Sequence, residues 1–380
     1  MNKLRLLLLI ILGGLSSKTL LAQERYEFTD VVRLEATNVK NQQITGACWS
    51  FSAASYIESE AIKKGMPVLD LSEMFVVHNI YIEKALNYVR RQGATQFGEG
   101  ALGNDFLLAA DKYGLVPEWI YPAREEGETF DHRELSLMLN SYLDGVLKNP
   151  AKKLSKYWLA GYIGILDAYM GQVPEKFEFD GKEYTPLTFA REIVKFDIED
   201  YIYLTSFTHE PYYKPFVLQV PDNFSSESYS NIPLDDFINA INYALDKGYT
   251  LEWDADASEK GFDGRKGIGI VPEKSWEEKT EEEKDSTFVV RESEKEITVE
   301  MRQQQYENYQ TTDDHLMHII GYANDSYGKL FYIVKNSWGT NKQIYNGYIY
   351  VSSSYMKLKT ISIIVNKAGI SKDLKKKLEL

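Results

Sequence analysis

The stretch Asn41-Gln-Gln-Ile-Thr-Gly-Ala-Cys-Trp-Ser-Phe51 contains the only cysteine in a chain of 380 residues. Apolar residues recur at helical spacing from Cys48 to Gly65, which predicts a helix that begins at the cysteine. Unpaired N–H groups and the helix dipole favour a negative sulfur there, and the thiolate is the nucleophilic form. Gly46 lets the backbone turn tightly before the helix. Gln42 offers an amide that could donate a hydrogen bond to a developing oxyanion.

A cysteine nucleophile requires a nearby base, and the sequence offers five histidines. His315 begins a β-like run that reaches Gly321-Tyr322. Further along, Asn336 could hold an imidazole in one orientation, and the indole of Trp338 could shield that contact from water. His318 is the rival base, but an offset of three along a strand places its ring on the opposite face. The pattern therefore favours His315 and predicts that His318 is a packed or hydrogen-bonded neighbour.

Three ordered motifs resemble the papain-like cysteine peptidases. They are Gln-x5-Cys-Trp at 42–49, Asp-His-x5-Gly-Tyr at 314–322 and Asn-Ser-Trp-Gly at 336–339. The stretches 112–118 and 185–191 are similar to the bleomycin hydrolase and aminopeptidase C branch of that family. With these included, the resemblance extends over most of the chain.

The resemblance implies a role for each residue of the predicted site. The residues are the nucleophile Cys48, the general acid/base His315, the orienting residue Asn336 and the oxyanion donor Gln42, supported by Trp49 and Trp338. Gly100 and Ala101 fall where the family places a backbone strip that pairs with the peptide substrate. No metal or other cofactor is implied.

The distribution of patterns predicts an α+β fold, rich in helices early and in strands late. The resemblance implies a papain-like domain over 23–380 with two subdomains, a helical N-terminal half and an antiparallel β-barrel-like C-terminal half. A large mixed insertion is expected at about 125–300. Outside the first helix, helices are expected at 72–91, 105–113, 132–148, 151–170 and 234–247, and strands at 217–220, 250–253, 318–322, 329–335, 347–351 and 360–365.

Composition and the N-terminal segment narrow the class of protein. Acidic residues outnumber basic ones by 56 to 43, and no clustered basic face is evident, so a nucleic-acid partner is not expected. One cysteine excludes an internal disulfide framework. Residues 1–22 combine a basic start with a short apolar run, which predicts a secretion signal and export to the periplasm or envelope of a bacterium. No membrane span is expected.

The predicted function is peptide hydrolysis by a cysteine peptidase of this family. Aminopeptidase activity is a narrower prediction, and the C-terminal segment does not support it. In the aminopeptidase C branch, the chain's own C-terminal arm enters the cleft and its carboxylate selects substrates with a free amino end. Here Ser371–Leu380 is predicted to form a short Ser-capped helix instead. A catalytically silent scaffold that binds peptides or proteins, and acyl transfer to amines, remain alternatives. A peptide substrate is the expected partner, and a homo-oligomer is left open.

Overall fold

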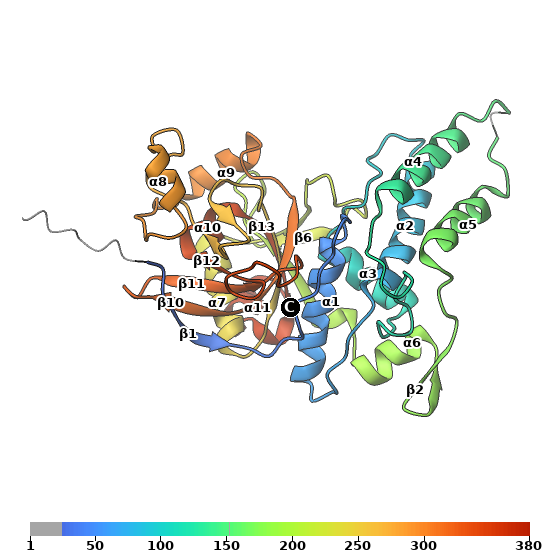
Figure 1. The fold of residues 1–380 in the computed structure, drawn as a ribbon, viewed down its shortest axis with the longest axis horizontal. Coiled ribbons are helices and arrows are strands. Elements are labelled where there is room, and N and C mark those ends of the chain that lie inside the picture. The colour runs from blue at the N-terminus through green and yellow to red at the C-terminus, as the bar shows by residue number, and fades with distance from the viewer. Residues whose placement is uncertain (1–24, 152) are drawn as a thin grey trace, which may run out of the picture.

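The computed structural model describes residues 25–151 and 153–380, so the predicted secretion signal at 1–22 lies outside the described residues. Within those ranges, none of the helices has the length and apolar character that a bilayer crossing requires. The described residues form the predicted α+β fold. A group of helices stands on one side and a large sheet with its own helices stands on the other (Figure 1).

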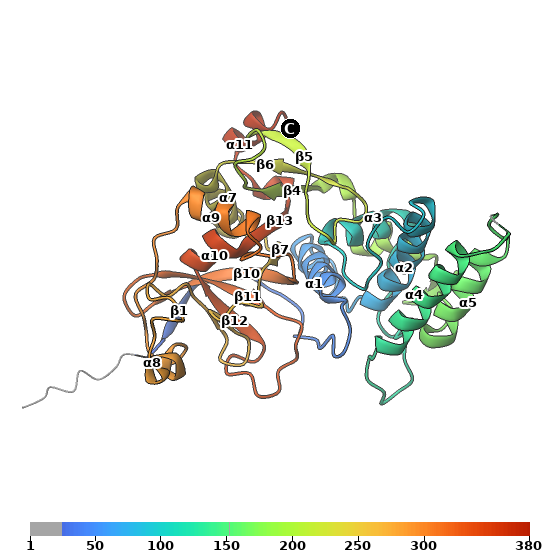
Figure 2. The same cartoon turned by 90° about the horizontal axis from the view of Figure 1, so that it is seen from above.

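Helix α1, Cys48–Lys63, lies between the two halves and is buried on all faces except at its last two residues. Helices α2 (Glu73–Arg90) and α3 (Gly103–Tyr113) pack on one side of it, and strands β7 (Leu251–Ala255) and β10 (His315–Asp325) pack on the other (Figures 1 and 2). A helix enclosed in this way needs small or apolar residues around its whole circumference. The predicted helix is thus confirmed as the central element of the fold.

The helical half is built on α2. Ser72 caps this helix, since its hydroxyl accepts a hydrogen bond from the Phe75 N–H at 3.1 Å. Helices α4 (Arg133–Leu147) and α5 (Trp158–Met170) pack against α2 and against each other. The predicted helix at 151–170 begins later, at Trp158. The side chain of Asn149 accepts from Ala151 N–H and donates to Lys153 O, and this local turn competes with helix formation.

The sheet is mixed and open. Its strands follow the order β5-β6-β4-β13-β7-β10-β11-β12-β9-β8, and β1 pairs with β10. The remaining bounds are β1 Phe28–Arg33, β4 Tyr201–Thr205, β5 Lys214–Val217, β6 Ser228–Asn231, β8 Phe262–Asp263, β9 Ile268–Gly269, β11 Leu330–Lys335, β12 Tyr348–Ser352 and β13 Thr360–Asn366.

The four predicted C-terminal strands are confirmed as β10, β11, β12 and β13, but the barrel-like arrangement predicted for this half is not formed. The two ends of the strand path, β5 and β8, do not pair with each other in the described ranges. Strands β4, β5 and β6, which lie within the predicted insertion, extend the sheet beyond β13 instead of letting it close. The strand predicted at 217–220 is wrong in position, because β5 covers Lys214–Val217 and shares only Val217 with the prediction.

Helices on the sheet bury its outer face. Helix α7 (Leu234–Asp246) presents Phe237 and Ile241 to the strand residues Trp253 and Ile363, all of them fully buried. The other helices on this side are α9 Val299–Glu307, α10 Ser353–Lys359 and α11 Lys372–Lys377, whereas α8 Glu281–Ser286 lies beside β1 on the opposite side (Figure 2). Helix α11 is the predicted Ser-capped C-terminal helix, because Ser371 Oγ accepts from Leu374 N–H at 3.1 Å.

One prediction concerns Gly321 of β10, which lies opposite Arg33 in the antiparallel pairing with β1. A Cβ at Gly321 would overlap the carbonyl oxygen of Val32 on β1, which is backbone and cannot move aside. We expect Gly321→Ala to lower the free energy of unfolding by about 1–3 kcal/mol. Gly145→Ala is the matched control, because Gly145 lies in α4 with open space around it and alanine there should add about 0.5–1 kcal/mol. Equal effects of the two substitutions in denaturant titrations would contradict this account.

Candidate active site

The predicted nucleophile is the first residue of α1. No side chain caps this end of the helix, because Ala47 occupies the N-cap position. The turn before it is tight: the Gly46 N–H donates to Glu99 Oε2 at 2.7 Å, and a Cβ on Gly46 would press on the Glu99 side chain. The indole N–H of Trp49 donates to the Glu99 carbonyl at 3.1 Å. Trp49 therefore fixes the loop around Glu99 to the start of α1.

His315 and Asn336 form a direct contact. The Nε2 of His315 lies 2.7 Å from Asn336 Oδ1, and both residues are buried. The same Oδ1 accepts the backbone N–H of Ser337 at 2.7 Å, which identifies that atom as the oxygen of the amide. Nε2 must then carry the proton and donate it. The remaining ring nitrogen, Nδ1, is left as the proton acceptor of the neutral imidazole.

Gln42 is tied to the same segment. Its Oε1 accepts the Ser337 hydroxyl at 2.6 Å, so its Nε2 is the donating end of the amide, and one N–H of that group reaches Thr45 O at 2.8 Å. The backbones pair as well, since Gln42 N–H donates to Ser337 O at 2.8 Å and Gly339 N–H donates to Lys40 O at 3.0 Å. A continuous chain of hydrogen bonds therefore connects Gln42 with His315.

The indole of Trp338 covers the imidazole. Its ring centroid lies 4.6 Å from that of His315, and the ring planes are inclined by 26°. Trp338 remains 37% exposed, whereas His315 is 5% exposed. The indole thus covers one face of the nearly buried imidazole and is itself partly open to solvent.

Cys48 contacts the backbone of the residue that follows His315. Cys48 is only 8% exposed, and the N–H of Leu316, the residue after His315, hydrogen-bonds to its sulfur and lowers its pKa. Burial acts more strongly and raises the pKa of the thiol to about 12, with the charges of Asp313 and Asp222 adding to the rise. Burial also lowers the pKa of His315 to about 4.

Burial opposes the ion pair of thiolate and imidazolium. The pKa of about 12 for the Cys48 thiol and of about 4 for His315 differ by about 8, so proton transfer from sulfur to imidazole costs about 11 kcal/mol before the two charges attract each other. That attraction at 4 Å is about 4 kcal/mol at an effective dielectric constant of 20. The N-terminus of α1 adds about 0.3–1 kcal/mol. The neutral thiol and imidazole are therefore favoured in the free site, and the charges of Asp313 and Asp222 favour the neutral thiol further.

The predicted substrate strip lies beside the start of α1. Gly100 is partly exposed, whereas Ala101 is buried. The Gly100 carbonyl accepts a hydrogen bond from the ammonium of Lys84 on α2, and a Cβ at Gly100 would overlap the carboxylate of Asp222. Sequence reasoning missed both neighbours. Lys84 reads as an ordinary helix residue, and Asp222 lies in the insertion, far from every motif.

His318 lies in the interface between α1 and β10. Its Nδ1 is 2.8 Å from Ser55 Oγ, and that hydroxyl accepts a hydrogen bond from Lys335 Nζ at 2.7 Å. The Ser55 proton is then available for His318 Nδ1. Burial, followed by the charge of Lys335, lowers the pKa of His318 well below its usual value. The arrangement fits the packed neighbour that the sequence predicted.

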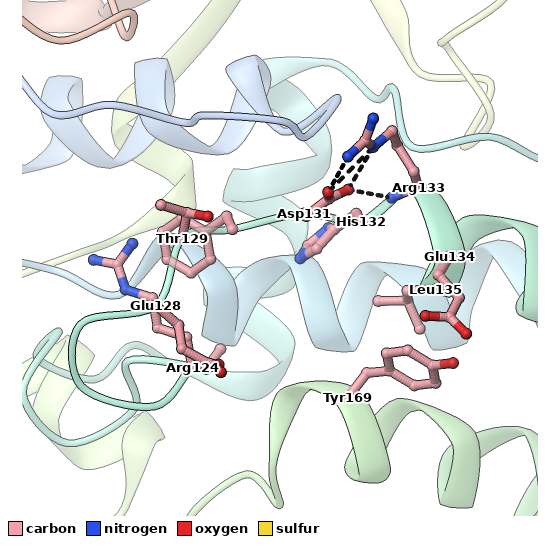
Figure 3. Close-up of a pocket in the computed structure, with 11 residues that line it drawn as sticks. Arg124, Glu128, Thr129, Asp131, His132, Arg133, Glu134, Leu135 and Tyr169 are labelled. Carbon is pink, nitrogen blue, oxygen red and sulfur yellow. Dashed lines mark hydrogen bonds and ion pairs between the residues drawn. The ribbon is translucent and has the colours of Figure 1, made fainter.

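A separate cavity of about 460 Å³ lies in the helical half (Figure 3). It is lined by the segment around His132 and by Tyr169 of α5, and none of the predicted site residues reaches it. Asp131 on its wall is held by the Arg133 guanidinium. No three His, Cys, Asp or Glu side chains in the described ranges converge as ligands for a metal ion.

Comparisons with known proteins agree with this architecture. The family model of the peptidase C1-like family matches residues 104–380, and that of the papain family cysteine proteases matches residues 25–87. Aminopeptidase C of Lactobacillus delbrueckii subsp. lactis is 24% identical over 91% of this chain and 83% of its own. Aminopeptidase C of Streptococcus thermophilus is 23% identical over 93% and 85%. The crystal structure of PepW from Lactobacillus rhamnosis HN001 has a TM-score of 0.71 at 20% identity, covering 92% of this chain and 84% of its own, which confirms the predicted fold.

A second prediction follows from the charges around the sulfur. Because the charge of Asp313 raises the pKa of the Cys48 thiol, Asp313→Asn should move the pH midpoint of Cys48 alkylation to lower pH. The measurement is the rate of iodoacetamide incorporation up to pH 10, where a lower midpoint gives a higher rate at each pH because more thiolate is present. The label reports one site because Cys48 is the only cysteine. Asp235→Asn, an exposed site on α7, removes the same charge elsewhere and should leave the midpoint in place. A midpoint unchanged in Asp313→Asn would show that Asp313 does not act on the sulfur.

Proposed function

The chain belongs to the peptidase C1-like family of cysteine-type peptidases, and we propose that it removes N-terminal residues from peptides through an acyl-enzyme formed on Cys48. The observation that carries this proposal is the hydrogen-bonded chain from Gln42 through Ser337 and Asn336 to His315, which leaves Nδ1 free. The N–H of the next residue, Leu316, contacts the Cys48 sulfur. A nucleophile, a base and an orienting group in this order are what covalent catalysis requires.

In the first step the Cys48 sulfur attacks the carbonyl carbon of the scissile bond. The thiol proton passes to Nδ1 of His315, which becomes an imidazolium, while the carbonyl oxygen becomes an oxyanion. Asn336 contributes by fixing the ring, because its Oδ1 accepts the Nε2 proton in both the neutral and the charged form. Trp338 limits the access of water to that hydrogen bond.

The oxyanion is stabilised by Gln42 and by the backbone N–H of Cys48 at the start of α1. The orientation that Ser337 imposes on Gln42 makes Nε2 the donor before any substrate arrives. Removal of one such donor typically raises the barrier by about 2.7–4 kcal/mol. Backbone hydrogen bonds between residues 40–42 and 337–339 hold the two loops, and with them the Gln42 amide, in this arrangement.

The intermediate then collapses with loss of the amine. His315 returns its proton to the leaving nitrogen, the C–N bond breaks and a thioester to Cys48 remains. A water molecule that gives its proton to His315 attacks the thioester, and the acid product leaves as the sulfur recovers its proton. No residue outside this group is needed for the proton transfers.

Removal of N-terminal residues, as distinct from internal cleavage, is supported by the relatives named aminopeptidase C. It is also supported by the narrowness of the site, because Cys48 is 8% exposed and Asp222 stands against Gly100. An extended chain that passes through in both directions would have to displace that side chain.

A third prediction tests the nucleophile. Cys48→Ala removes the attacking atom, and we expect kcat to fall by at least about 10^4-fold. Hydrolysis of a fluorogenic dipeptide amide measures the loss, and the unfolding midpoint shows whether the fold is retained. Hydrolysis that survives in Cys48→Ala would place the nucleophile elsewhere. A wild type that binds the peptide without cleaving it would indicate a binding scaffold.

A fourth prediction tests the mode of action. We expect a short peptide with a free amino end to be cleaved at least about 100-fold faster than its N-acetylated twin, measured as kcat/KM, which corresponds to about 2.7 kcal/mol. Release of the first residue, followed by mass spectrometry, identifies the bond that is cut. Equal rates for the twins, with cleavage at internal bonds, would show an endopeptidase.

A further inference from the structure

The segment between β5 and β6, residues 218–227, forms a braced loop at the cleft. Asn223 sits at its centre, donating through Nδ2 to Leu218 O and to Glu227 O, both at 2.9 Å, and accepting the Glu227 N–H at 3.0 Å. Contacts from other elements add to this. The Asn104 amide on α3 donates to Ser225 Oγ at 3.1 Å. The residue at the tip, Asp222, is therefore presented from a rigid support.

Asp222 stands directly on the strip predicted to pair with substrate. Its carboxylate fills the space that a Cβ on Gly100 would need, and the Lys84 ammonium donates a hydrogen bond to the Gly100 carbonyl. Gln96 Nε2, at 3.4 Å from Oδ1, is its one hydrogen-bond donor in the described ranges. A peptide that approaches Cys48 along this strip meets a carboxylate at the position of Gly100.

Few donors reach the carboxyl groups at this end of the cleft. The charges of Asp222 and Asp313 both raise the pKa of the Cys48 thiol. Burial raises the pKa of Asp222, Asp313 and Asp254, while the charge of Lys84 lowers the pKa of Asp222. The Lys84 ammonium donates to the Gly100 carbonyl, and within the described ranges it forms no ion pair with Asp222. Asp222 therefore has a cation nearby but no direct ion-pair partner.

The C-terminal helix does not supply a group to this position. Lys377 on α11 pairs with Asp236 of α7 at 3.0 Å, and Leu374 is buried in the core between that helix and the sheet (Figure 2). Glu379 lies 3.4 Å from Lys214 at the start of β5. Residues 372–379 thus occupy the outer face of the sheet, and the carboxylate in the cleft comes from the insertion.

We propose that Asp222, held by the 218–227 loop, is the specificity-determining residue that closes the cleft at Gly100 and binds the α-ammonium group of the substrate. This inference rests on the proposed function. An ammonium fits because it brings a positive charge and three N–H donors to a carboxylate whose one side-chain donor in the described ranges is Gln96, at 3.4 Å. A neutral acetylated terminus brings neither, and it adds bulk where Asp222 already stands.

The test compares three coumarylamides: alanyl, acetyl-alanyl and acetyl-lysyl. In the wild type we expect the free alanyl substrate to be strongly preferred over its acetyl twin. Asp222→Asn should reduce that preference at least tenfold, chiefly through a higher KM for the free amine. Glu227→Gln is the matched control, because it removes the same charge from the same loop and should keep the preference. Stoichiometric alkylation of Cys48 confirms that each variant retains its site.

The outcomes separate the two claims. If the wild type hydrolyses none of the substrates, the proposed function fails. If it prefers the free amine and Asp222→Asn retains that preference, Asp222 is not the specificity residue and the proposed function stands. If acetyl-lysyl is cleaved as fast as alanyl, the bound cation is a side chain and the α-ammonium assignment is overturned. Should Asp222→Asn fail to fold, Asp222→Glu moves the carboxylate by one methylene and should reduce the preference by raising KM, whereas an unchanged preference would contradict the proposal.

Discussion

The placement of every group at this site depends on the burial of α1 between a layer of helices and a sheet. Because the helix is enclosed, its first residue is held in fixed relation to β10, and the sulfur of Cys48 meets the N–H of Leu316. Burial also determines the chemistry. It makes an isolated thiolate costly and an isolated imidazolium costly, so the reactive state must form as a pair. The same enclosure that positions the nucleophile thus makes its reactivity sensitive to neighbouring charges.

The second organising feature is the paired arrangement of two loops that are distant in sequence. Three residues follow β11 in succession. Asn336 contacts the edge of the His315 imidazole, Ser337 contacts the Gln42 amide, and Trp338 stacks on the face of the imidazole. One short turn therefore sets the tautomer of His315 and the direction of the Gln42 amide. Its backbone pairing with residues 40–42 joins two distant parts of the chain at the proposed active site.

The sequence predicted the parts of the molecule that are encoded locally. The positions of Cys48, His315 and Asn336 follow from three short motifs, and the first helix and the last four strands follow from periodicity. Sequence reasoning missed the hairpin of β2 (Phe177–Phe179) and β3 (Lys182–Tyr184). The signal for it was the pair Asp180-Gly181, whose residues both adopt the positive φ of a tight hairpin turn. Barrel closure was predicted wrongly, since it depends on which strand edges meet. Asp222 had no local signal, because its place over Gly100 is set by contacts such as that between Asn104 and Ser225, which lie 121 residues apart.

The contact between Gln42 and Ser337 has a consequence for how the protein is made. The two residues are separated by 295 positions, so the contact closes only when nearly the whole chain is available. Chains emerge from the ribosome N-terminus first, and such distant pairings form late in folding. During synthesis the cysteine is therefore present long before the imidazole that would activate it. A partly made chain carries an inert thiol, and proteolytic competence arises only when the finished polypeptide assembles.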